Sequence, residues 1–380
     1  MTPGCGYSAL RRLKGAKMET DWTGRHVIVT GATGFIGRRL VHALTLAGAV
    51  VTILTRSRAS LAGLPPAVRP CIGAMTDREA LRKALAGQEI LFNIAYDVRA
   101  TAAENLAAFD CLLAAASEAG VKRVVHTSSI VVYDAWPASD CDEAGTMDRP
   151  GGSPYRRAKI EMERRLMAGP LPAAILQPTI VWGPGSALWT DGFARALLAG
   201  GVVIPEPEGL CNGVFVDDVV QACLKAALIP GLGRERFVIS GAEPFPWSAL
   251  VDGYARILGT NGALREPAAE IEAALGPKPV EDGADHAPSL AARVSAVGRQ
   301  VLGHRRFEAL VAFAQAKLAK GGVLQPNHHL FEEYMGRGLC RIDHARARLG
   351  YAPEFDLARG LAATAAHLQA MKRQARSANR

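Results

Sequence analysis

The sequence has no run of about 20 uninterrupted apolar residues, the length that a membrane-spanning helix needs. We therefore expect no integral membrane segment. Its seven cysteines are scattered, odd in number and free of C-x-x-C pairs, so neither a zinc site nor a disulfide framework is expected. His328-His329 has no cysteine or acidic companion at ligand spacing, and no metal is predicted. This cysteine usage favours a reducing, cytoplasmic location.

Charge and composition set wider bounds. The net charge is +8, but the basic residues include clusters near both ends of the chain, which are typical of solvated tails, so we expect no nucleic-acid partner. A chain of 380 residues with 49% hydrophobic content can bury a large core. It could form one large domain or a main fold with a smaller lobe.

The segment 26–47 has the pattern of an apolar strand, a glycine turn and a helix. The turn is Thr30-Gly31-Ala32-Thr33-Gly34-Phe35-Ile36-Gly37. Gly31 would permit the tight turn, Gly34 would let backbone N–H groups approach a pyrophosphate, and Gly37 would let the helix pack closely on the strand. The helix N-terminus adds the positive end of a dipole. The sequence therefore predicts a dinucleotide site here, the alternative being an ordinary turn.

The next apolar strand, at 50–55, is followed by Arg56-Ser57-Arg58. A dinucleotide fold meets the adenosine ribose at this point, where an acidic residue would bind the 2′-hydroxyl of NAD. No carboxylate stands there in the sequence, and the guanidinium groups of Arg56 and Arg58 suit a 2′-phosphate. NADP(H) is therefore favoured over NAD(H), unless both arginines are ordinary solvated loop charges.

A second set of polar residues follows the strand expected at 123–128. That strand leads into Ser129, and Tyr155 and Lys159 lie downstream, four apart, which places them on one face of a helix. A lysine ammonium beside a phenol, near an oxidised nicotinamide, is expected to lower the tyrosine pKa from about 10 toward working pH. Tyr155 would then exchange a proton with a substrate hydroxyl or carbonyl, and Ser129 would hold the same oxygen.

Several motifs in order along the chain make it resemble the extended short-chain dehydrogenase/reductase family, known broadly as NAD-dependent epimerase/dehydratases. The resemblance runs from about residue 25 to 258 and resumes near Cys340. Its marks are T-G-A-T-G-F-I-G, the segment 118–129 with Tyr133 after it, Tyr155 with Lys159, Q-P-T-I-V-W-G-P at 177–184, V-D-D-V at 216–219 and A-R-L-G-Y-A-P at 347–353.

The resemblance implies that Ser129, Tyr155 and Lys159 are catalytic. It also implies that Asn105 supports the active-site region from its helix, and that Pro178 and Thr179 line the nicotinamide side. The full set of expected cofactor-binding residues is Gly31, Thr33, Gly34, Phe35, Ile36, Gly37, Arg56, Arg58, Ala95, Asn105, Thr127, Tyr155, Lys159, Pro178 and Thr179.

Departures from the family pattern bear on the reaction. Members that eliminate water place an Asp-Glu pair after the catalytic hydroxyl, and related decarboxylases a glutamate, whereas this chain has Ile130-Val131. Reversible hydride transfer at a carbinol carbon is what remains. Nucleotide-sugar members commonly grip the pyrophosphate with an arginine where this chain has Cys211-Asn212. The arginines that could replace it are Arg195, Arg234 and Arg236.

Strand and helix patterns alternate from Val27 to about Ala174, which predicts an α/β fold: a Rossmann-type, doubly wound parallel sheet with a smaller C-terminal substrate-binding lobe. Strands are expected near 27–30, 50–55, 68–72, 90–94, 123–128, 173–177, 214–216 and 237–239, helices at 38–47, 155–167, 219–227 and 250–258, and a loop at 205–209. The expected division is an N-terminal extension at 1–22, a dinucleotide-binding core with the catalytic residues at 23–200, and remaining core elements with the substrate lobe at 201–370.

Residues 263–338 match no motif of the family and are expected to form a helical insertion. Apolar helical faces at 290–301 and 307–318 predict two helices packed on the substrate lobe. A lid, a contact in a homodimer or a peripheral membrane surface stays open for the same segment.

Three functions remain open for a small-molecule substrate. The first is an NAD(P)-dependent oxidoreductase or epimerase acting on a nucleotide sugar, which the breadth of the family favours. The second is an NADPH-dependent ketoreductase or hydroxysteroid-type dehydrogenase on a less polar substrate, which Arg56 and the missing pyrophosphate arginine favour. The third, a non-catalytic dinucleotide-sensing protein, is disfavoured because Ser129, Tyr155 and Lys159 are all present.

Overall fold

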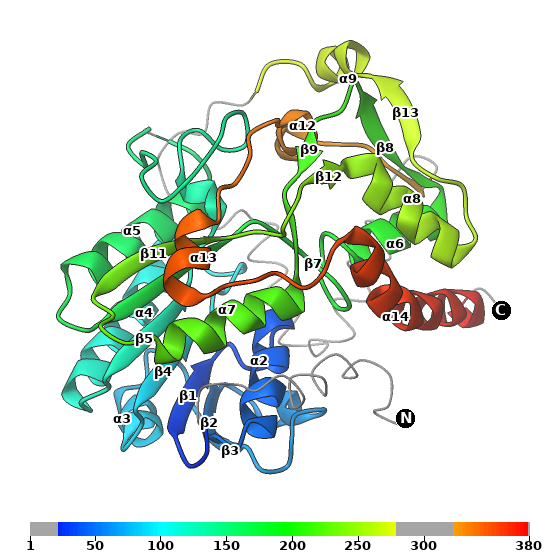
Figure 1. The fold of residues 1–380 in the computed structure, drawn as a ribbon. Helices are drawn as coiled ribbons and strands as arrows, with labels where there is room; N and C mark the ends of the chain where they lie inside the picture. The colour runs from blue at the N-terminus through cyan, green and yellow to red at the C-terminus, as the bar shows by residue number, and fades with distance from the viewer. Residues whose placement is uncertain (1–21, 150, 279–321, 379–380) are drawn as a thin grey trace.

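The computed structural model describes residues 22–149, 151–278 and 322–378, and its centre is a parallel sheet of seven strands. The strands are β1 (His26–Thr30), β2 (Val50–Thr55), β3 (Arg69–Ile72), β4 (Ile90–Asn93), β5 (Arg123–Thr127), β6 (Ala173–Pro178) and β11 (Arg234–Ile239). Their order across the sheet is β11-β6-β5-β4-β1-β2-β3. The chain therefore runs from the middle of the sheet to one edge and then to the other, which confirms the predicted doubly wound fold (Figure 1).

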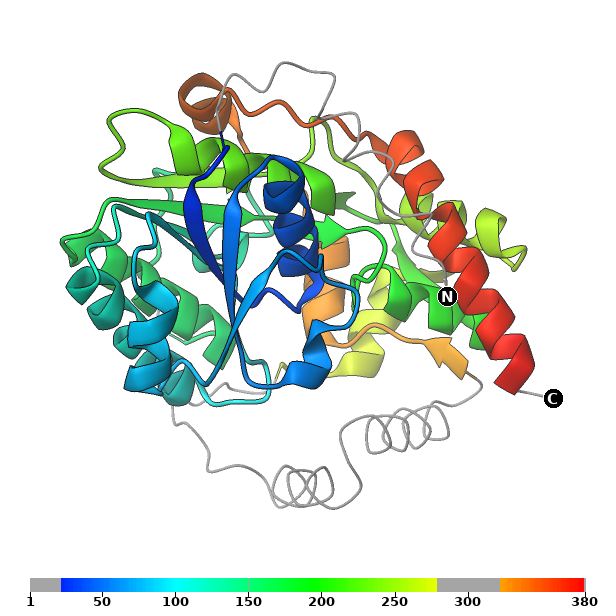
Figure 2. The same ribbon diagram turned by 90° about the horizontal axis from the view of Figure 1, so that it is seen from below.

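Helices cover both faces of this sheet (Figure 2). Successive residues of a strand point to opposite faces, so Val27 and Val29 pack into one hydrophobic layer and Ile28 into the other. The first layer holds α2 (Phe35–Leu46) and α7 (Val216–Leu228), and the second holds α3 (Arg78–Leu85), α4 (Ala102–Glu118) and α5 (Pro154–Ala168).

Local capping explains where the two site-bearing helices begin. α4 follows Thr101, whose hydroxyl accepts a hydrogen bond from the Glu104 backbone N–H while the Glu104 carboxylate accepts one from the Thr101 backbone N–H. α5 follows Ser153, which caps the Arg156 N–H, and carries Pro154 in its first turn. Tyr155 is thereby set in the first turn of α5.

The C-terminal half adds shorter elements. They are β7 (Ile180–Trp182), α6 (Asp191–Ala199), β8 (Gly201–Glu206), β9 (Leu210–Cys211), β10 (Gly213–Phe215), β12 (Phe245–Pro246), α8 (Trp247–Leu258), β13 (Leu264–Pro267), α9 (Ala268–Leu275), β14 (Val323–Leu324), α12 (His328–Met335), α13 (Asp343–Leu349) and α14 (Leu357–Ala378). β8 is the centre of a small parallel sheet with β13 and β14.

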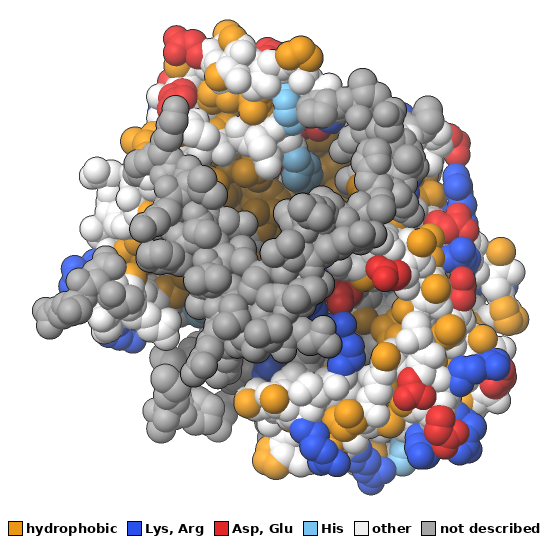
Figure 3. Space-filling model, turned by 180° about the vertical axis from the view of Figure 1, so that it is seen from behind, with side chains coloured by type: hydrophobic (Ala, Val, Ile, Leu, Met, Phe, Trp, Pro, Cys, Tyr) orange, Lys and Arg blue, Asp and Glu red, His pale blue; other side chains and the backbone are white. Residues whose placement is uncertain are grey.

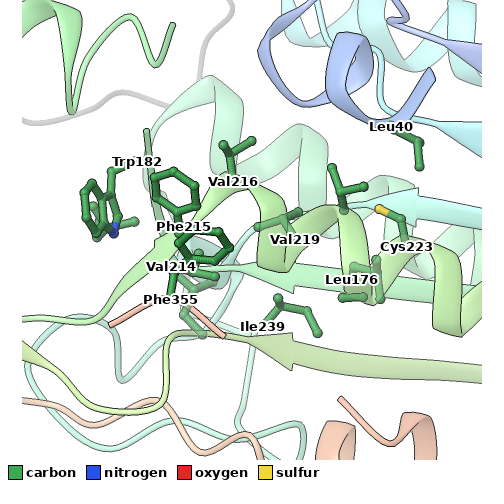
Figure 4. Packing of buried hydrophobic residues seen from close by; sticks show 14 of the residues in the cluster. Leu40, Leu176, Trp182, Val214, Phe215, Val216, Val219, Cys223, Ile239 and Phe355 are labelled. Carbon is green, nitrogen blue, oxygen red and sulfur yellow. The ribbon is translucent and has the colours of Figure 1, made fainter. Parts of the chain in front are cut away.

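Aromatic side chains tie this half to the main sheet (Figure 4). The ring of Phe215 lies 4.3 Å from that of Phe355 and 5.2 Å from that of Trp182, measured between centroids. The Asp218 carboxylate accepts hydrogen bonds from the backbone N–H groups of Glu354 and Phe355, which fixes the chain before α14. One hydrophobic cluster runs from the nucleotide-binding half into these C-terminal helices.

The structure moves several predicted boundaries. Trp22, assigned to the N-terminal extension, is 1% exposed, and its ring lies 6.2 Å from that of Phe92 on β4, so the hydrophobic cluster includes it. α2, α7 and α8 each begin about three residues before the predicted start, and in α2 and α7 the first turn is built from motif residues that carry little helical periodicity. β8 continues to Glu206, so the loop expected at 205–209 starts later.

Two further observations concern the predicted insertion and the surface. The helices expected at 290–301 and 307–318 lie outside the described residues, and the described part of the insertion contains two short strands and two short helices. Among the described residues, none of the helices has the length and apolar character needed to cross a bilayer. Lys, Arg, Asp and Glu side chains are interspersed over the lower right of the face in Figure 3.

Candidate active site

The glycine turn between β1 and α2 has the geometry that its sequence predicts. Gly31 has a φ of +70°, and a Cβ there would lie 2.7 Å from the Ala95 backbone nitrogen. A Cβ on Gly37 would lie 2.1 Å from the Gly31 carbonyl oxygen, so the helix packs directly on the turn. A Cβ on Gly34 would meet only that same oxygen, at 3.3 Å, which leaves the space in front of Gly34 open to a ligand.

A pocket of about 590 Å³ lies in front of this turn. Its wall contains six of the residues expected to bind the cofactor: Gly31, Thr33, Gly34, Arg56, Ala95 and Asn105. The other expected residues, Arg58, Tyr155 and Lys159 among them, are not part of this wall. The open space at Gly34 and the arginine-bearing wall fit the phosphates of a dinucleotide, and their binding role stays a prediction.

Asp97 and Arg99 belong to the same wall, and the sequence analysis missed both. Asp97, in the loop after β4, lies 2.8 Å from the Arg56 guanidinium and also accepts hydrogen bonds from the backbone and side chain of Arg99. Partial burial alone would raise the pKa of Asp97, but the bonds from Arg99 and Arg56 outweigh it and hold that pKa at about 2. The only signal in the sequence is that residues 96–99 follow a strand end beside Ala95.

The Asn105 side chain is hydrogen-bonded to the loop after β4, which carries Asp97. Its side chain accepts from the Asp97 N–H at 2.9 Å and donates to the carbonyl oxygens of Asp97 and Thr101 at 2.9 and 3.0 Å. These bonds fix the segment that carries Asp97 and Arg99. The described contacts of Asn105 therefore support the pocket wall from α4, whereas the resemblance implied support of the active-site region.

The predicted catalytic residues come together at the carboxyl edge of the sheet. Lys159 is 3% exposed, and its ammonium donates to the Thr127 carbonyl oxygen at 2.7 Å. The same nitrogen lies 5.7 Å from the centroid of the Tyr155 ring. Ser129 follows β5 as the N-cap of a short 3-10 helix at Ile130–Val132, which places its hydroxyl beside Tyr155.

The pKa of Tyr155 differs from the sequence expectation. Burial raises the pKa of Tyr155 to about 12, with Tyr96 adding to the rise and a hydrogen bond with Ser129 opposing it. Lys159 is not among the causes of this shift in the protein's own groups, and the lowering expected with an oxidised nicotinamide nearby stays a prediction. Burial also lowers the pKa of Lys159 to about 8, against the attraction of Glu163.

Tyr96 is another residue that the sequence analysis missed. Its ring stands edge-on to that of Tyr155 at 4.8 Å, and the Lys159 ammonium lies 5.1 Å from its centroid. Tyr96 also lines the pocket in front of the glycine turn. Tyr96 thus lies between that pocket and the predicted catalytic residues Tyr155 and Lys159.

Two remaining expected residues lie at the ends of β6 and β11. Pro178 ends β6, and the Thr179 hydroxyl is held near the Ile239 carbonyl oxygen and the Ser240 hydroxyl, at 3.4 and 3.2 Å. Their contact with a nicotinamide stays a prediction.

The residues considered for binding a substrate pyrophosphate have other partners. Asn212 is 4% exposed, donates to the Gly338 carbonyl oxygen at 2.8 Å and accepts from the Cys340 N–H at 3.1 Å. Arg236 lies 2.7 Å from the buried Glu163 carboxylate. Arg234 is the first residue of β11 and so lies at the amino ends of the strands, opposite the carboxyl ends where the predicted catalytic residues lie. Arg195 donates to the Ala187 carbonyl oxygen at 3.3 Å.

A glycine-turn pocket beside a Ser-Tyr-Lys set, at the carboxyl edge of a doubly wound sheet, defines an NAD(P)-dependent enzyme of the short-chain dehydrogenase/reductase class. The chain belongs to the NAD-dependent epimerase/dehydratase family, whose model matches residues 27–239.

Curated relatives differ in the reactions that their names describe. A 4-hydroxy-2-methyl-3-oxo-4-farnesyl-3,4-dihydroquinoline-1-oxide ketoreductase of Stigmatella aurantiaca is 27% identical over 352 residues, which are 88% of this chain and 93% of the relative. A UDP-glucose 4-epimerase of Mycolicibacterium smegmatis is 30% identical over 270 residues, 63% of this chain and 84% of the relative.

Solved structures share the fold at low identity. MoeE5, in complex with UDP-glucose and NAD, aligns with a TM-score of 0.64 and 21% identity, covering 91% of this chain and 99% of that chain. The epimerase Mth375 of Methanothermobacter thermautotrophicus aligns with a TM-score of 0.67 and 16% identity, covering 97% and 98%. At these identities the likeness shows the fold alone.

Proposed function

We propose that this enzyme reduces a ketone on a weakly polar substrate with NADPH. The observation that carries the proposal is the hydrogen bonding of Asn212. Family members that bind nucleotide sugars commonly have an arginine at this place, which binds the pyrophosphate of the substrate. The Asn212 amide is buried and bonded on both sides to the 338–340 segment. Arg236 is paired with Glu163, and Arg234 lies at the other edge of the sheet. Among the described residues considered for this role, Asn212, Arg234 and Arg236 are therefore not placed to hold a diphosphate.

Tyr155 is the proton donor in this proposal. A ketone being reduced must receive a proton on its oxygen, and the Tyr155 phenol, whose pKa burial raises to about 12, is protonated at neutral pH as an ordinary tyrosine also is. Ser129 would hold the ketone oxygen, and Lys159 would orient the cofactor ribose and assist proton return. The reduced nicotinamide, when bound, supplies the hydride.

The relatives give this proposal further support. The ketoreductase of Stigmatella aurantiaca aligns over 88% of this chain, a span that includes the segment without family motifs. We further propose the NADP(H) preference predicted from Arg56 and Arg58. A cytoplasmic location, a homodimer and a division of the chain near residue 200 also stay predictions.

A second candidate is an epimerase acting on a nucleotide sugar. The 30% identity to the UDP-glucose 4-epimerase of Mycolicibacterium smegmatis favours it. An epimerase oxidises and then re-reduces one substrate, so it would keep its nucleotide through purification and consume none.

Two measurements separate these candidates. The purified protein is denatured and the released nucleotide quantified, and the intact protein is then mixed with NADPH and a panel of aryl, alkyl and steroidal ketones. Ketone-dependent loss of NADPH absorbance that disappears in Tyr155→Phe is expected. A stoichiometric, non-exchanging nucleotide together with conversion of UDP-glucose to its 4-epimer would contradict the proposal.

A further inference from the structure

Arg56, Asp97 and Arg99 form an ion-pair cluster in the pocket wall. The cluster brings together a group that suits a 2′-phosphate and a group that suits a 2′-hydroxyl. Arg56 follows β2, where a 2′-phosphate would be read, and Asp97 brings a carboxylate to the same place from the loop after β4. A carboxylate suits the 2′-hydroxyl of NAD, and a guanidinium suits the 2′-phosphate of NADP. The sequence places no acid after β2, but the fold supplies one.

We propose that Asp97 determines the cofactor specificity of this enzyme by competing with a 2′-phosphate for Arg56. The inference rests on the proposed use of this pocket for the adenosine end of a dinucleotide. On this proposal Asp97 lowers the affinity for NADP(H) relative to NAD(H), whichever of the two cofactors the unmutated protein prefers.

The contacts explain how the competition would work. The Asp97 carboxylate lies 2.8 Å from Arg56 Nη1 and 3.0 Å from Arg99 Nε. Two guanidinium groups and one carboxylate leave a net charge of +1 in the cluster, whereas two positive charges would face a phosphate if the carboxylate were absent. Since the Arg56 side chain is 65% exposed, it can turn from Asp97 to a ligand.

The position of Asp97 is fixed by its surroundings, so the competition is built into the fold. Asn105 bonds both the N–H and the carbonyl oxygen of Asp97, and the Arg99 backbone N–H donates to the Asp97 carboxylate at 3.0 Å. An asparagine at this position would keep an oxygen for the Arg99 N–H while removing the negative charge. Asp97→Asn is therefore a charge change that preserves the loop.

The test is calorimetric titration with adenosine 2′,5′-bisphosphate and with adenosine 5′-monophosphate, which differ only in the 2′-phosphate and need no catalytic residue. We expect Asp97→Asn to raise the ratio of the two affinities, bisphosphate over monophosphate, about tenfold (about 1.4 kcal/mol). Adding Arg56→Gln to Asp97→Asn should remove the gain, because Arg56 would no longer receive the phosphate.

Glu89→Gln is the matched control. Glu89 also contacts an arginine, at 3.4 Å from Arg25, but it precedes β4 at the opposite edge of the sheet. This change should leave the affinity ratio within twofold of the unmutated protein. An unchanged ratio in Asp97→Asn, or an equal loss of both nucleotides, would overturn the inference. A monophosphate preference in the unmutated protein would instead refute the proposed NADP(H) preference, and the response to Asp97→Asn would still be readable.

Discussion

The Lys159 ammonium donates a hydrogen bond of 2.7 Å to the Thr127 carbonyl oxygen, which joins α5 to the end of β5. A primary ammonium has three N–H donors, so this bond leaves others for the cofactor ribose. The bond also holds Lys159 where burial lowers its pKa to about 8. The charge proposed to bind the cofactor is thus lost as the pH rises through about 8, well below the range in which an ordinary lysine loses its proton.

We therefore expect kcat/KM for NADPH to fall as pH rises through about 8, because the ammonium loses its proton there and this parameter reports the free enzyme. Glu163→Gln should move the fall to lower pH, since Glu163 is the charge that opposes deprotonation. Glu161→Gln, the same charge change at a half-buried position of the same helix, should leave the pH profile in place. A profile that is flat up to pH 10 would show that Lys159 keeps its ordinary affinity for a proton.

Replacing Tyr155 with phenylalanine should abolish turnover while leaving cofactor affinity nearly intact, because only the transferable proton is removed. We expect the rate of hydride transfer to fall by about a hundredfold or more. Single-turnover absorbance measurements check this without interference from product release. Hydride transfer at the unmutated rate would remove Tyr155 from the acid/base role. Lys159→Ala differs from this change in that both rate and cofactor affinity should fall.

Ser129→Ala should lower turnover by about a hundredfold, the scale for losing one oriented donor at a reacting oxygen. It should also raise the pKa of Tyr155 further, because the Ser129 hydrogen bond opposes the rise caused by burial. The check is a comparison of kcat with Ser128→Ala, in which the neighbouring hydroxyl is removed instead. Equal losses of kcat in the two variants would mean that Ser129 does not donate a hydrogen bond to the reacting oxygen in the way proposed.

Arg56→Asp should reverse the proposed preference for NADP+ over NAD+, because it replaces the guanidinium proposed to bind the 2′-phosphate with a second carboxylate beside Asp97. Dissociation constants for both cofactors measure the effect. Arg58→Asp makes the same charge change outside the pocket wall and should alter the ratio less. Equal affinities for the two cofactors in the unmutated protein would contradict the predicted role of the arginines.

Gly37→Ala should destabilise the fold by about 2 kcal/mol, since the added methyl would need the Gly31 carbonyl oxygen to move. The new Cβ would otherwise lie 2.1 Å from that oxygen. Urea unfolding midpoints give the measurement. Gly233→Ala is the control, because a Cβ at Gly233 would have nothing within 4 Å. A Gly37→Ala protein as stable as this control would show that α2 can shift away from the turn at little cost.

The parts of the site that could be predicted are those in which spacing along one turn or one helix fixes how the residues lie relative to one another. Gly31 and Gly37 lie within one turn and helix start, so their spacing predicts their contact. Tyr155 and Lys159 are four apart on α5, and that spacing alone places them on one side of the helix. The alternation of strands and helices predicted the doubly wound sheet for the same reason, because periodicity is a local property.

The pairing of Arg56 with Asp97 shows what local spacing cannot reveal. The two residues are 41 apart in the chain and follow strands β2 and β4, which are separated in the sheet by β1. Parallel strands bring their carboxyl ends to one edge, but which loop residues meet there depends on loop paths and on bonds such as those of Asn105. The environment of Tyr155 is of the same kind, because burial comes from Tyr96 and other residues distant in sequence.

The sequence by itself therefore determined the class of fold, the geometry of the glycine turn and the placing of Tyr155 and Lys159 on one side of a helix, since each depends on residues close together in the chain. Only the tertiary structure decided that Asp97 faces Arg56, and that the Asn212 side chain is hydrogen-bonded to the 338–340 segment. It also decided that burial raises the pKa of Tyr155. Charge pairing and desolvation depend on distances across the fold, and these are set by how the elements pack rather than by the order of residues in the chain.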